Sequence, residues 1–499
     1  MAFPFFLAIL ASLQNKLKIL FFAQIISFKE KRNCIFLFVF SFLFFLSGNS
    51  QVKPRIINDI TALNPVEVDS ILIPLTTEEI ANAVKNCKGP ISIGGGKYSQ
   101  GGQTMEEKSL HIDMRGFNKV LNFSKENKEI TVQAGIIWRK VLEYIDTFDL
   151  SVRIMQTYAN FTVGGSLSVN VHGRYVGEGP LILSVKQFNI ILADGSLLRA
   201  SRQENSELFY SAIGGYGGLG VITEVTLYLT DNCKVMRTDK MMKIKNYKNF
   251  FFEKIKSDSL AIFHNADIYP RRYKKVRAIT YTKTNEKLTE TNRLKPLGSK
   301  YRFHRFAFRV ISGFPGGKWI RKSIFDPLVN LGNPVEWRNF EAGYEVKELE
   351  PKSRKKSTYV LQEYFVPVNE FDKFYPEMKK VFRKHHVNVM NVSIRYAKKD
   401  PGSLLAWAKQ DVFAFVVYYK QGTREKDRGR VREWTKELVD VALSCKGSYY
   451  LPYQIHASAE QFAAAYPNAK KFFELKKKLD PQNKFRNKLW DAYYNVKEN

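Results

Sequence analysis

Four short glycine-bearing stretches carry the clearest chemical signal in this chain of 499 residues. They are "GGGKYSQGG" (94–102), "QAG" (133–135), "VGGSLSVNVHG" (163–173) and "GGYGGLGVI" (214–222). Backbone at glycine has no Cβ atom in the way, so its N–H groups can converge on one ligand. Tight turns and close strand crossings also use glycine. Four such stretches within 130 residues favour a ligand, and an extended pyrophosphate is the one expected.

Two familiar phosphate-binding motifs do not fit these glycines. The first stretch is not a P-loop, because Tyr98 follows Lys97 where Ser or Thr is required, and Ile91 stands where the leading glycine belongs. The last stretch contains a literal GxGxxG, Gly215 to Gly220. That motif should follow a strand and open a helix, whereas here it precedes a strand-like run. A nicotinamide-binding Rossmann domain is therefore disfavoured.

The elements expected around the glycines form a compact α+β unit over residues 56–230. "IPLTTEEIANAVKNC" (73–87) predicts a strand end and then a Thr-capped helix, and "IWRKVLEYIDTF" (137–148) has helical spacing. "FNIILADGSLLRAS" (188–201) predicts a hairpin closed by Asp-Gly. "SELFYSAIGGYGGLGVITEVTLYL" (206–229) predicts a helix, a glycine-rich turn and a strand. The glycine stretches are therefore expected where strands begin or end.

The second half of the chain has more Lys, Arg and Phe and fewer glycines. Two extended runs, "YVLQEYFVP" (359–367) and "DVFAFVVYY" (411–419), bracket a predicted helix, "FDKFYPEMKKVFRKHH" (371–386). This order predicts a second α+β domain built on an antiparallel sheet. The tail "AAAYPNAKKFFELKKKLDPQNKF" (463–485) is expected to be helical up to its Asp-Pro stop.

Composition limits the class of protein. The chain is long enough for two or three domains, and its 44% hydrophobic content is that of a globular protein. The four cysteines, Cys34, Cys87, Cys233 and Cys445, are far apart, so neither a zinc site nor a disulfide framework is supported. The net charge of +30 leaves open a phosphate-bearing ligand, an anionic membrane surface or a solvated lysine-rich surface. No nucleic-acid-binding motif accompanies the charge, so no nucleic-acid partner is expected.

Residues 1–50 differ from the rest of the chain. A basic cluster at residues 29–32 precedes an apolar run, Cys34 to Leu46, which is the layout of a secretory signal. The run is short for a bilayer-spanning helix, but apolar stretches lie upstream, so an uncleaved anchor or a wrongly chosen start codon stays open. We expect a signal or membrane-anchor segment and a membrane-associated or exported (periplasmic) protein. A wrong start would instead indicate a cytoplasmic one.

Five ordered blocks resemble the FAD-binding domain of the vanillyl-alcohol oxidase / p-cresol methylhydroxylase (PCMH) superfamily. They are "PISIGGGKYSQGG", "EITVQAGIIWRKV", "QTYANFTVGGSLSVNVHGRY", "VKQFNIILADGSLLRAS" and "ELFYSAIGGYGGLGVITEVTL". "VNVHG" together with the tail from "HASAEQF" onward is similar to the aldonolactone oxidases and also to decaprenylphosphoryl ribose oxidase. The resemblance implies a two-subdomain FAD-binding domain with an α+β cap domain on an antiparallel sheet. We expect a segment at 1–50, the FAD domain at 51–232, the cap or substrate domain at 233–450, and a C-terminal segment at 451–499 packing back on the FAD domain.

The resemblance also implies which residues contact FAD. The residues it places at the pyrophosphate turn, beside the flavin and along the ribityl and adenine groups are Gly94, Gly95, Gly96, Lys97, Tyr98, Ser99, Gly135, Gly164, Gly165, Ser166, Ser168, His172, Gly220, Val221 and Ile222. Covalent members of the group carry a histidine after the first glycine turn, and this chain has none between Pro90 and Leu110. Non-covalent FAD is therefore expected, and no metal.

The candidate catalytic residues come from the cap half of the chain. A flavin-dependent alcohol oxidation needs a group to take the hydroxyl proton and positive potential near the flavin pyrimidine. "NVSIRYAKKD" offers Arg395 and Lys398, "LQEYFVP" offers Glu363, and "YQIHASAE" offers His456. The last block resembles the His-Trp-Ala-Lys segment of lactone oxidases, but Ala457 replaces the Trp and no Lys follows.

The sequence therefore predicts an FAD-dependent oxidoreductase that oxidises a sugar-derived alcohol or aldonolactone, as a D-arabinono-1,4-lactone oxidase does, by hydride transfer to flavin N5. Oxygen or a quinone is the expected electron acceptor. One alternative is an oxidase or epimerase of a polyprenyl-phosphate-linked sugar at a membrane. The non-enzyme alternative is a basic protein with a flavin fold that binds an anionic surface. A visible flavin spectrum that bleaches with an alcohol would separate the enzymes from the last alternative.

Overall fold

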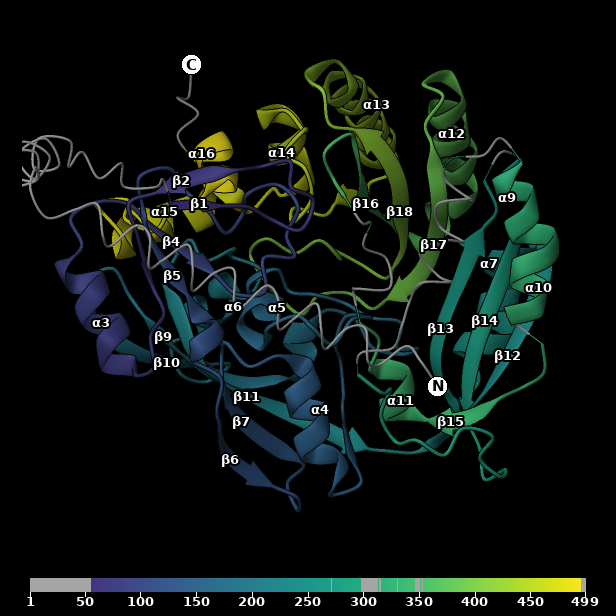
Figure 1. The fold of residues 1–499 in the computed structure, drawn as a ribbon, viewed down its shortest axis with the longest axis horizontal. Helices are drawn as coiled ribbons and strands as arrows, with labels where there is room; N and C mark the ends of the chain where they lie inside the picture. The colour runs from purple at the N-terminus through teal and green to yellow at the C-terminus, as the bar shows by residue number, and fades with distance from the viewer. Residues whose placement is uncertain are drawn as a thin grey trace, which may run out of the picture. The chain divides into compact units, whose positions relative to one another are not determined.

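The computed structural model describes residues 55–494, except residues 271, 298–312, 314–315, 330, 346–350 and 352. The described residues form one compact unit (Figure 1). The expected signal or anchor at residues 1–50 lies outside the described residues. Within the part that is described, no helix combines the length and the apolar character needed to cross a bilayer.

The glycine-rich half is built on small sheets. One is parallel, with the order β3 (Ser70–Leu72), β5 (Leu110–Asp113) and β4 (Ile91–Gly94). A second has the order β10 (Leu197–Ser201), β9 (Val185–Ile191), β11 (Val221–Asp231), β7 (Glu129–Gln133) and β6 (Val120–Ser124), and β8 (Leu150–Val152) pairs with β11. A two-stranded pair joins β1 (Arg55–Ile57) to β2 (Val66–Val68). The helices of this half are α3 (Thr77–Asn86), α4 (Trp138–Asp146), α5 (Val163–Ser168) and α6 (Ser206–Ala212).

Local sequence explains where these elements begin and end. Thr76 caps α3, its side chain accepting a hydrogen bond from the Glu79 N–H at 3.1 Å. The Asp-Gly turn closes the β9–β10 hairpin as predicted, with Gly195 at φ +87°. The expectation of plain strand ends at residues 163–173 was wrong, because Thr162 caps a short helix there instead.

The second half is dominated by one eight-stranded sheet. Its order is β15 (Val335–Trp337), β12 (Lys234–Lys243), β14 (Lys275–Lys283), β13 (Ala261–Ile268), β17 (Val389–Ala397), β18 (Val412–Gly422), β16 (Ser357–Pro367) and β19 (Ser448–Tyr449). Every pairing in it is antiparallel. The predicted α+β class with an antiparallel cap sheet is thus confirmed.

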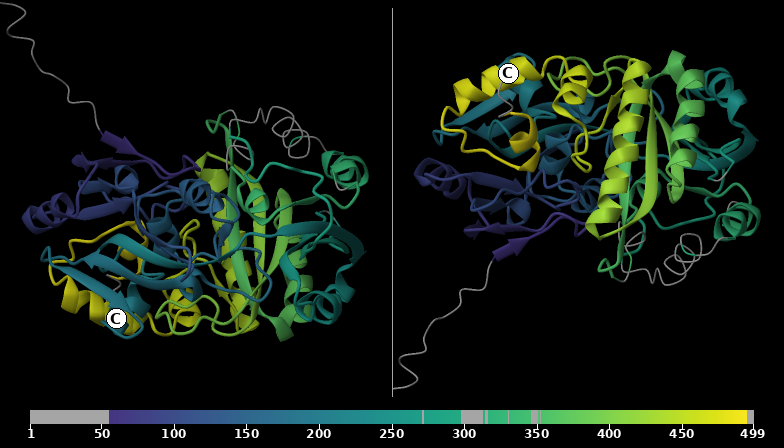
Figure 2. Two further views of the ribbon diagram at one scale, coloured as in Figure 1. Left: turned by 90° about the horizontal axis from the view of Figure 1, so that it is seen from below. Right: turned by 90° about the horizontal axis from the view of Figure 1, so that it is seen from above.

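Two long helices cover one face of this sheet. They are α12 (Phe371–Lys384) and α13 (Glu425–Ser444), which lie along β16 and β18 in both views of Figure 2. Shorter helices at the sheet's ends are α7 (Tyr247–Phe250), α9 (Gly317–Ile320), α10 (Asp326–Val329) and α11 (Arg338–Ala342). The opposite face of β16, β17 and β18 is free of these long helices and turns toward the glycine-rich half (Figure 2).

The C-terminal helices return to the glycine-rich half. They are α14 (Ala459–Ala465), α15 (Ala469–Leu479) and α16 (Lys488–Tyr493). Ile91 of β4 forms a bridge with Phe485. The fully buried Lys476 ammonium donates to Gly218 O at 2.9 Å and to Phe485 O at 2.8 Å, and pairs with Asp480 at 2.9 Å. These contacts tie the end of the chain to the fourth glycine stretch.

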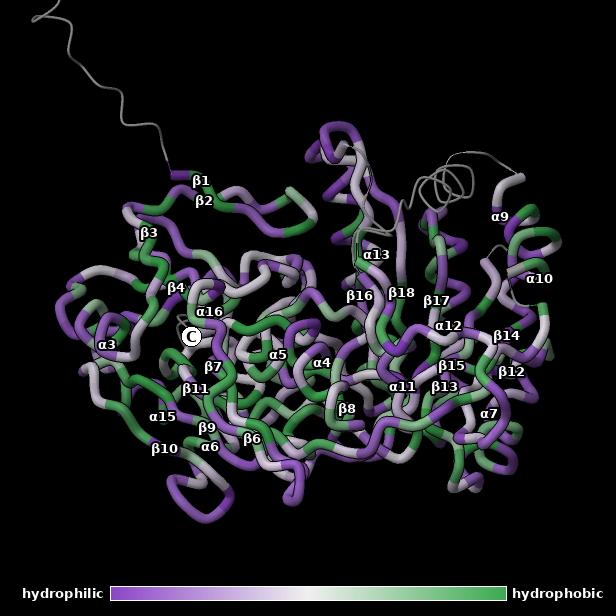
Figure 3. The backbone as a smooth tube through the Cα atoms, turned by 60° about the horizontal axis from the view of Figure 1, so that its bottom comes forward, coloured by the Kyte–Doolittle hydropathy of each residue, from purple (hydrophilic) through white to green (hydrophobic). Residues whose placement is uncertain are grey.

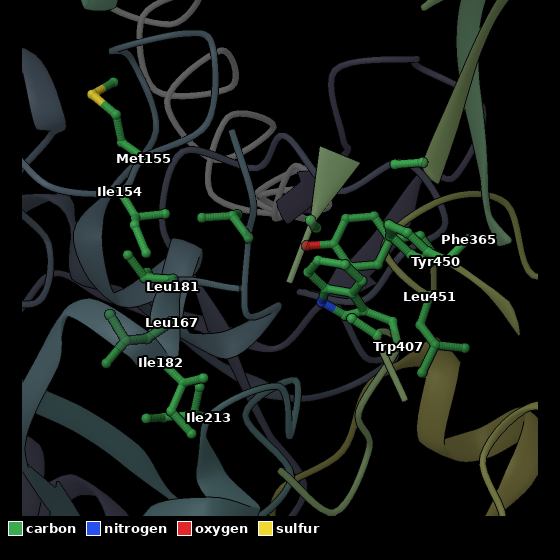
Figure 4. Close-up of a cluster of buried hydrophobic side chains, with 14 of the residues drawn as sticks. Ile154, Met155, Leu167, Leu181, Ile182, Ile213, Phe365, Trp407, Tyr450 and Leu451 are labelled. Carbon is green, nitrogen blue, oxygen red and sulfur yellow. The ribbon is translucent and has the colours of Figure 1, made fainter. Parts of the chain in front are cut away.

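The core is continuous between the two halves. Figure 3 shows hydrophobic residues gathered around α5, β9 and β11, with hydrophilic loops at the edge. Figure 4 shows Phe365 of β16 beside Trp407 and Tyr450, and the Phe365 and Trp407 rings stack at 4.1 Å. Since Phe365 and Trp407 are both almost fully buried, this aromatic group is a rigid support for whatever packs against it.

Candidate active site

One large cavity lies between the glycine stretches and the free face of the eight-stranded sheet. About 1360 Å³ of space in it is free of protein atoms, including the part that is open to solvent. The predicted site residues that line it are Gly94, Gly95, Gly96, Lys97, Tyr98, Ser99, Gly164, Gly165, Ser168, His172, Gly220, Ile222, Glu363 and Arg395.

The turn after β4 forms one wall. Lys97 adopts φ +60° there, and its ammonium lies 3.3 Å from Asp113. Among the described residues, the backbone N–H groups of Gly95, Gly96 and Ser99 donate to no protein acceptor. Donors left free on a turn that lines a cavity can bind an anion, as expected for a pyrophosphate. This wall fits the phosphates of FAD.

Helix α5 forms a second wall, but it uses its N–H groups differently from the prediction. Val163 N–H and Gly164 N–H donate to the carbonyls of Ile136 and Ala134 at 2.8 and 2.7 Å. Gly165 N–H is held by the Thr162 hydroxyl at 3.3 Å. These donors are already satisfied within the protein, so α5 presents a bare surface to the ligand and not a set of free donors. An added Cβ at Gly165 would meet only Thr162 Oγ1, at 2.8 Å.

The sheet provides the third wall. Side chains alternate along a strand, so Leu361 and Glu363 of β16 face the cavity together. Glu363 pairs in register with Val416 of β18, which also lines the cavity. Arg395 of β17 lies opposite Ala414 of β18. The antiparallel register thus brings a carboxylate and a guanidinium from strands separated by β18 to the same wall.

Glu363 is held by two neighbours. Its Oε1 lies 2.6 Å from His172 Nε2, and its Oε2 accepts a hydrogen bond from the Tyr453 hydroxyl at 3.2 Å. His172 packs edge-on against Phe365, 5.5 Å between ring centroids, and lies 5.0 Å from Trp407. Burial, reinforced by the Glu363 charge, raises the pKa of Tyr453 well above its usual value. Tyr453 therefore stays a hydrogen-bond donor at neutral pH.

Arg395 and two threonine hydroxyls are polar groups of the cavity that could bind a ligand. Arg395 Nε, Thr104 Oγ1 and Thr157 Oγ1 are buried, and none of them has a partner among the described residues. Burial lowers the pKa of Arg395 and the Glu363 carboxylate opposes that shift, and the arginine side chain keeps its charge in proteins. Buried polar groups without partners are costly, so these three atoms indicate a polar ligand. They fit the carbonyl and hydroxyl oxygens of a flavin and a sugar.

Two predicted catalytic residues lie elsewhere. Lys398 is exposed in the loop after β17, and its backbone N–H donates to Glu178 O at 3.0 Å. His456 lines a separate cavity beside Arg428 and Arg432. Its Nδ1 lies 2.8 Å from the Thr435 hydroxyl, and burial followed by these arginines lowers the pKa of His456 to about 3. Neither residue lines the main cavity, so the geometry does not support their predicted catalytic roles.

Three predicted cofactor contacts are packed behind the cavity wall. A Cβ added at Gly135 would overlap the Met114 carbonyl, so this glycine permits two chain segments to cross. Ser166 accepts from Trp138 Nε1 at 2.8 Å and donates to Gln156 at 2.8 Å. Val221 is fully buried in β11. These residues shape the wall from behind and do not line the cavity.

The sequence alone did not identify several residues that line the cavity. Tyr453 lies three positions before His456, in the same block, yet only Tyr453 faces Glu363. Phe161 was also missed; it lines the cavity and stacks on the predicted Tyr98 at 4.4 Å between ring centroids. The sequence signal that could have identified Tyr453 is a strand-like alternation through "YYLPYQIH" (449–456), which Pro452 interrupts.

Two protein families match separate parts of the chain. Residues 68–201 match the FAD binding domain, and residues 341–493 match D-arabinono-1,4-lactone oxidase. The glycine walls of the cavity fall mainly in the first region, and Glu363, Arg395 and Tyr453 in the second. The two regions named by the families are thus the two that meet at the cavity.

Individual proteins similar to this chain include oxidases and dehydrogenases, at sequence identities below 30%. The chain is 29% identical to cytokinin dehydrogenase 2 of Arabidopsis thaliana over 37% of its length, a match that spans only 38% of that relative. It is 22% identical to L-gulonolactone oxidase of Mus musculus, over 77% of this chain and 85% of that one. A cholesterol oxidase variant from Brevibacterium sterolicum has a similar fold, with TM-score 0.67 and 14% identity, covering 88% of this chain and 97% of that one.

The cavity, its free donors and both family matches agree on one conclusion. The predicted resemblance to PCMH-type flavoproteins is confirmed, and so is FAD as the cofactor. The chain thus carries two regions that match families of flavin-dependent oxidoreductases, the FAD binding domain over residues 68–201 and D-arabinono-1,4-lactone oxidase over residues 341–493.

Proposed function

We propose that this protein oxidises a CH–OH group of an aldonolactone or a closely related sugar-derived alcohol. The match to D-arabinono-1,4-lactone oxidase over residues 341–493 and the likeness to L-gulonolactone oxidase support this substrate class. The observation that carries the proposal is the wall formed by Glu363, His172, Tyr453 and Arg395, which faces the glycine-lined part of the same cavity.

Hydrogen-bond chemistry defines what the Glu363–His172 pair can do. His172 Nδ1 lies 3.2 Å from the Gly173 carbonyl, and a carbonyl only accepts, so Nδ1 carries the proton. The contact between Nε2 and Glu363 Oε1 then needs one further proton, located on either atom. The pair can exist with or without this bridging proton, and the form without it can accept a proton at the cavity wall. That is the property required to deprotonate a substrate hydroxyl.

Arg395 supplies the complementary charge. Bound FAD provides the hydride acceptor for the carbinol carbon. As the hydroxyl proton leaves toward Glu363 and His172, negative charge develops on the substrate oxygen. The unpartnered Arg395 Nε can donate to that oxygen or to the flavin pyrimidine carbonyl. Thr104 and Thr157 can bind further hydroxyls of the sugar or ribityl chain, since their own hydroxyls have no partner among the described residues.

The experiment is anaerobic reduction of the purified flavoprotein by a panel of sugar lactones, followed by loss of the oxidised-flavin absorption. We expect at least one aldonolactone to bleach the wild type. Glu363→Gln should bind the same compound and bleach at least about 10²-fold more slowly, the low end for a positioned acid–base group. Glu178→Gln is the matched control, because Glu178 pairs with Arg153 outside the cavity. Full-speed bleaching by Glu363→Gln would exclude this carboxylate as the base.

The electron acceptor and location are also proposed. Oxygen or a quinone would reoxidise the flavin, and parallel assays of oxygen uptake and quinone reduction distinguish them. We further propose that the enzyme works at a membrane or beyond it. Support comes from the basic-then-apolar sequence of residues 29–46. Fractionation of the full chain tests this, and a wholly soluble cytosolic protein that retains residues 1–50 would contradict it.

A further inference from the structure

A second cavity lies between helix α13, helix α16 and the loop that joins β1 to β2. Its charged lining residues are Arg428 and Arg432 of α13 and Lys488 of α16, and His456 lines it beside them. The other described residues that line it are uncharged, so no carboxylate belongs to the described lining. About 790 Å³ of space in it is free of protein atoms, including the part that is open to solvent. The charge of the described lining is therefore entirely positive.

Helix α13 places its two arginines on one face, because Arg428 and Arg432 are four residues apart. Among the described residues, the one carboxylate that pairs with them is Glu425, 4.0 Å from Arg428 Nε and 3.8 Å from Arg432 Nη2. These distances exceed those of hydrogen bonds, and the Glu425 side chain is 73% exposed. An exposed pair of this length stabilises little. Both guanidinium groups therefore keep N–H donors available for a ligand.

Lys488 and His456 extend this positive wall. The Lys488 ammonium lies 3.5 Å from Glu107, and an ammonium has three donors, so others are left for a ligand. His456 Nδ1 lies 2.8 Å from the Thr435 hydroxyl. Burial first, and then the two arginines, lower the pKa of His456 to about 3, so its imidazole is neutral near pH 7. The contribution of the arginines to this shift reflects the positive potential that they create in the cavity.

The wall opposite α13 is held in place by hydrogen bonds. Asp59 accepts from the Thr61 N–H at 2.9 Å and from Asn64 Nδ2 at 2.6 Å, and the Thr358 hydroxyl of β16 donates to Thr61 O at 2.9 Å. These bonds fix the loop that joins β1 to β2, which lies near one end of α13 (Figure 2, β1 and β2 in dark purple). A wall that is ordered before a ligand binds reduces the entropic cost of binding.

The second cavity is separate from the flavin-binding walls, although the two are close. Tyr453 and Gln100 line the main cavity. The residues that follow them, Gln454 and Gly101, line the second cavity instead. Gln100 N–H donates to the Pro452 carbonyl at 2.6 Å, so these two segments are joined where they divide the cavities. Neither FAD nor a substrate at Glu363 accounts for the cations on the far side of this partition.

We propose that the second cavity binds an oxyanion of the phosphate class, either inorganic phosphate or the phosphate group of a small organic molecule. A phosphate group carries about 1.5 to 2 negative charges near pH 7 and has three strong acceptor oxygens, whereas a carboxylate carries one charge. Two guanidinium groups and one ammonium therefore match a phosphate better, and the planar fork of arginine suits its geometry. The proposal does not depend on the proposed oxidation.

The test is titration calorimetry on the full-length holoprotein, in which FAD occupies the glycine-lined walls. The probes are inorganic phosphate, glycerol 3-phosphate and acetate, at constant ionic strength. We expect saturable binding of one phosphate or one glycerol 3-phosphate per chain, and much weaker binding of acetate. Tighter binding of glycerol 3-phosphate would identify an organic phosphate as the ligand, and tighter binding of inorganic phosphate the free ion.

Two pairs of substitutions on α13 locate the bound anion. Arg428→Gln/Arg432→Gln removes both guanidinium groups from the cavity and should weaken phosphate binding at least about tenfold. Lys426→Gln/Arg430→Gln is the matched control, because it removes two charges at the same spacing from the same helix. Both control residues are exposed, and neither lines the cavity. Unchanged flavin content and circular dichroism show that each variant folds.

Three results would overturn the proposal. The first is the absence of saturable phosphate binding to the holoprotein, and the second is acetate binding as tight as that of phosphate. The third is an equal loss of binding in the two paired variants, which would reduce the effect to the overall charge of the protein. The assay measures heat of binding and not flavin reduction, so its failure leaves the proposed oxidation intact.

Discussion

Glu363 and His172 lie 191 positions apart in the chain, yet Glu363 Oε1 and His172 Nε2 are 2.6 Å apart at the wall of the cavity. One comes from the cap sheet and the other from the loop after α5. Two groups that share one proton should act as a unit, so their removal should not be additive. We expect Glu363→Gln and His172→Gln each to slow flavin reduction, and the double variant to be little slower than the worse single one. Stopped-flow rates measure this, and strict additivity would show that the two side chains act separately.

The charge of Arg395 should affect the reduction potential of the bound flavin. Replacing it by Met removes a buried positive charge from the cavity wall, so reduced flavin should become harder to form. We expect the reduction potential to fall by about 30 mV or more, equivalent to tenfold in a two-electron equilibrium. Arg395→Lys should restore part of the loss. An unchanged potential in Arg395→Met would place its charge away from the flavin.

Gly165 should control cofactor binding. Val at this position adds a branched side chain to the bare surface of α5, where even a Cβ is 2.8 Å from Thr162 Oγ1. We expect Gly165→Val to purify without yellow colour. Gly429→Val is the control, because a Cβ there meets nothing within 4 Å. Measuring flavin content per protein decides the matter, and full loading of Gly165→Val would contradict the assignment of this wall.

The flavin should be released intact on denaturation. His172 is the one histidine among the described residues that lines the cavity, no cysteine lines it there, and both ring nitrogens of His172 are engaged. A covalent link through a histidine or cysteine of this lining is therefore not expected, and non-covalent FAD stays the prediction. Acid precipitation should leave all yellow colour in the supernatant. Colour in the washed precipitate would be the opposite result.

Glu106 should make stability depend on pH. Burial and the neighbouring Asp491 raise the pKa of Glu106 to about 7. The folded state therefore binds a proton more tightly than the unfolded chain, whose carboxyl titrates near 4.5. This contribution is fully present below pH 4.5 and is lost as the pH rises through 7. Glu106→Gln imitates the protonated form, so its melting temperature should exceed that of wild type at pH 8, and the difference should vanish near pH 4.

Sequence patterns predicted the features that depend on neighbouring residues along the chain. The cap at Thr76, the Asp-Gly hairpin and the long strand carrying Glu363 all follow from short-range rules, whereas the strand that carries Arg395 was not predicted. The patterns failed where tertiary contacts decide. His456 and Tyr453 share one block, and only the direction of the chain after Pro452 determines which of them faces Glu363.

The glycines show the same limit. Gly135 and Gly165 cannot be told apart from the sequence, yet Gly135 lets two chain segments cross and Gly165 borders the cavity. The difference depends on which backbone lies opposite, and that is a property of the assembled fold. Resemblance to a family located the cofactor domain, whereas the individual contacts needed the structure.

The contacts of Lys476 with Gly218 and Phe485 have a consequence for biosynthesis. The loop that carries Gly217 and Gly220 is held by residues made some 260 positions later, as the Lys476–Gly218 pair shows. A nascent chain that has emerged only through β11 lacks this support, however complete its own sheet. Cofactor loading should therefore wait until translation has passed Phe485, and ribosome-stalled chains shorter than that should fail to retain flavin.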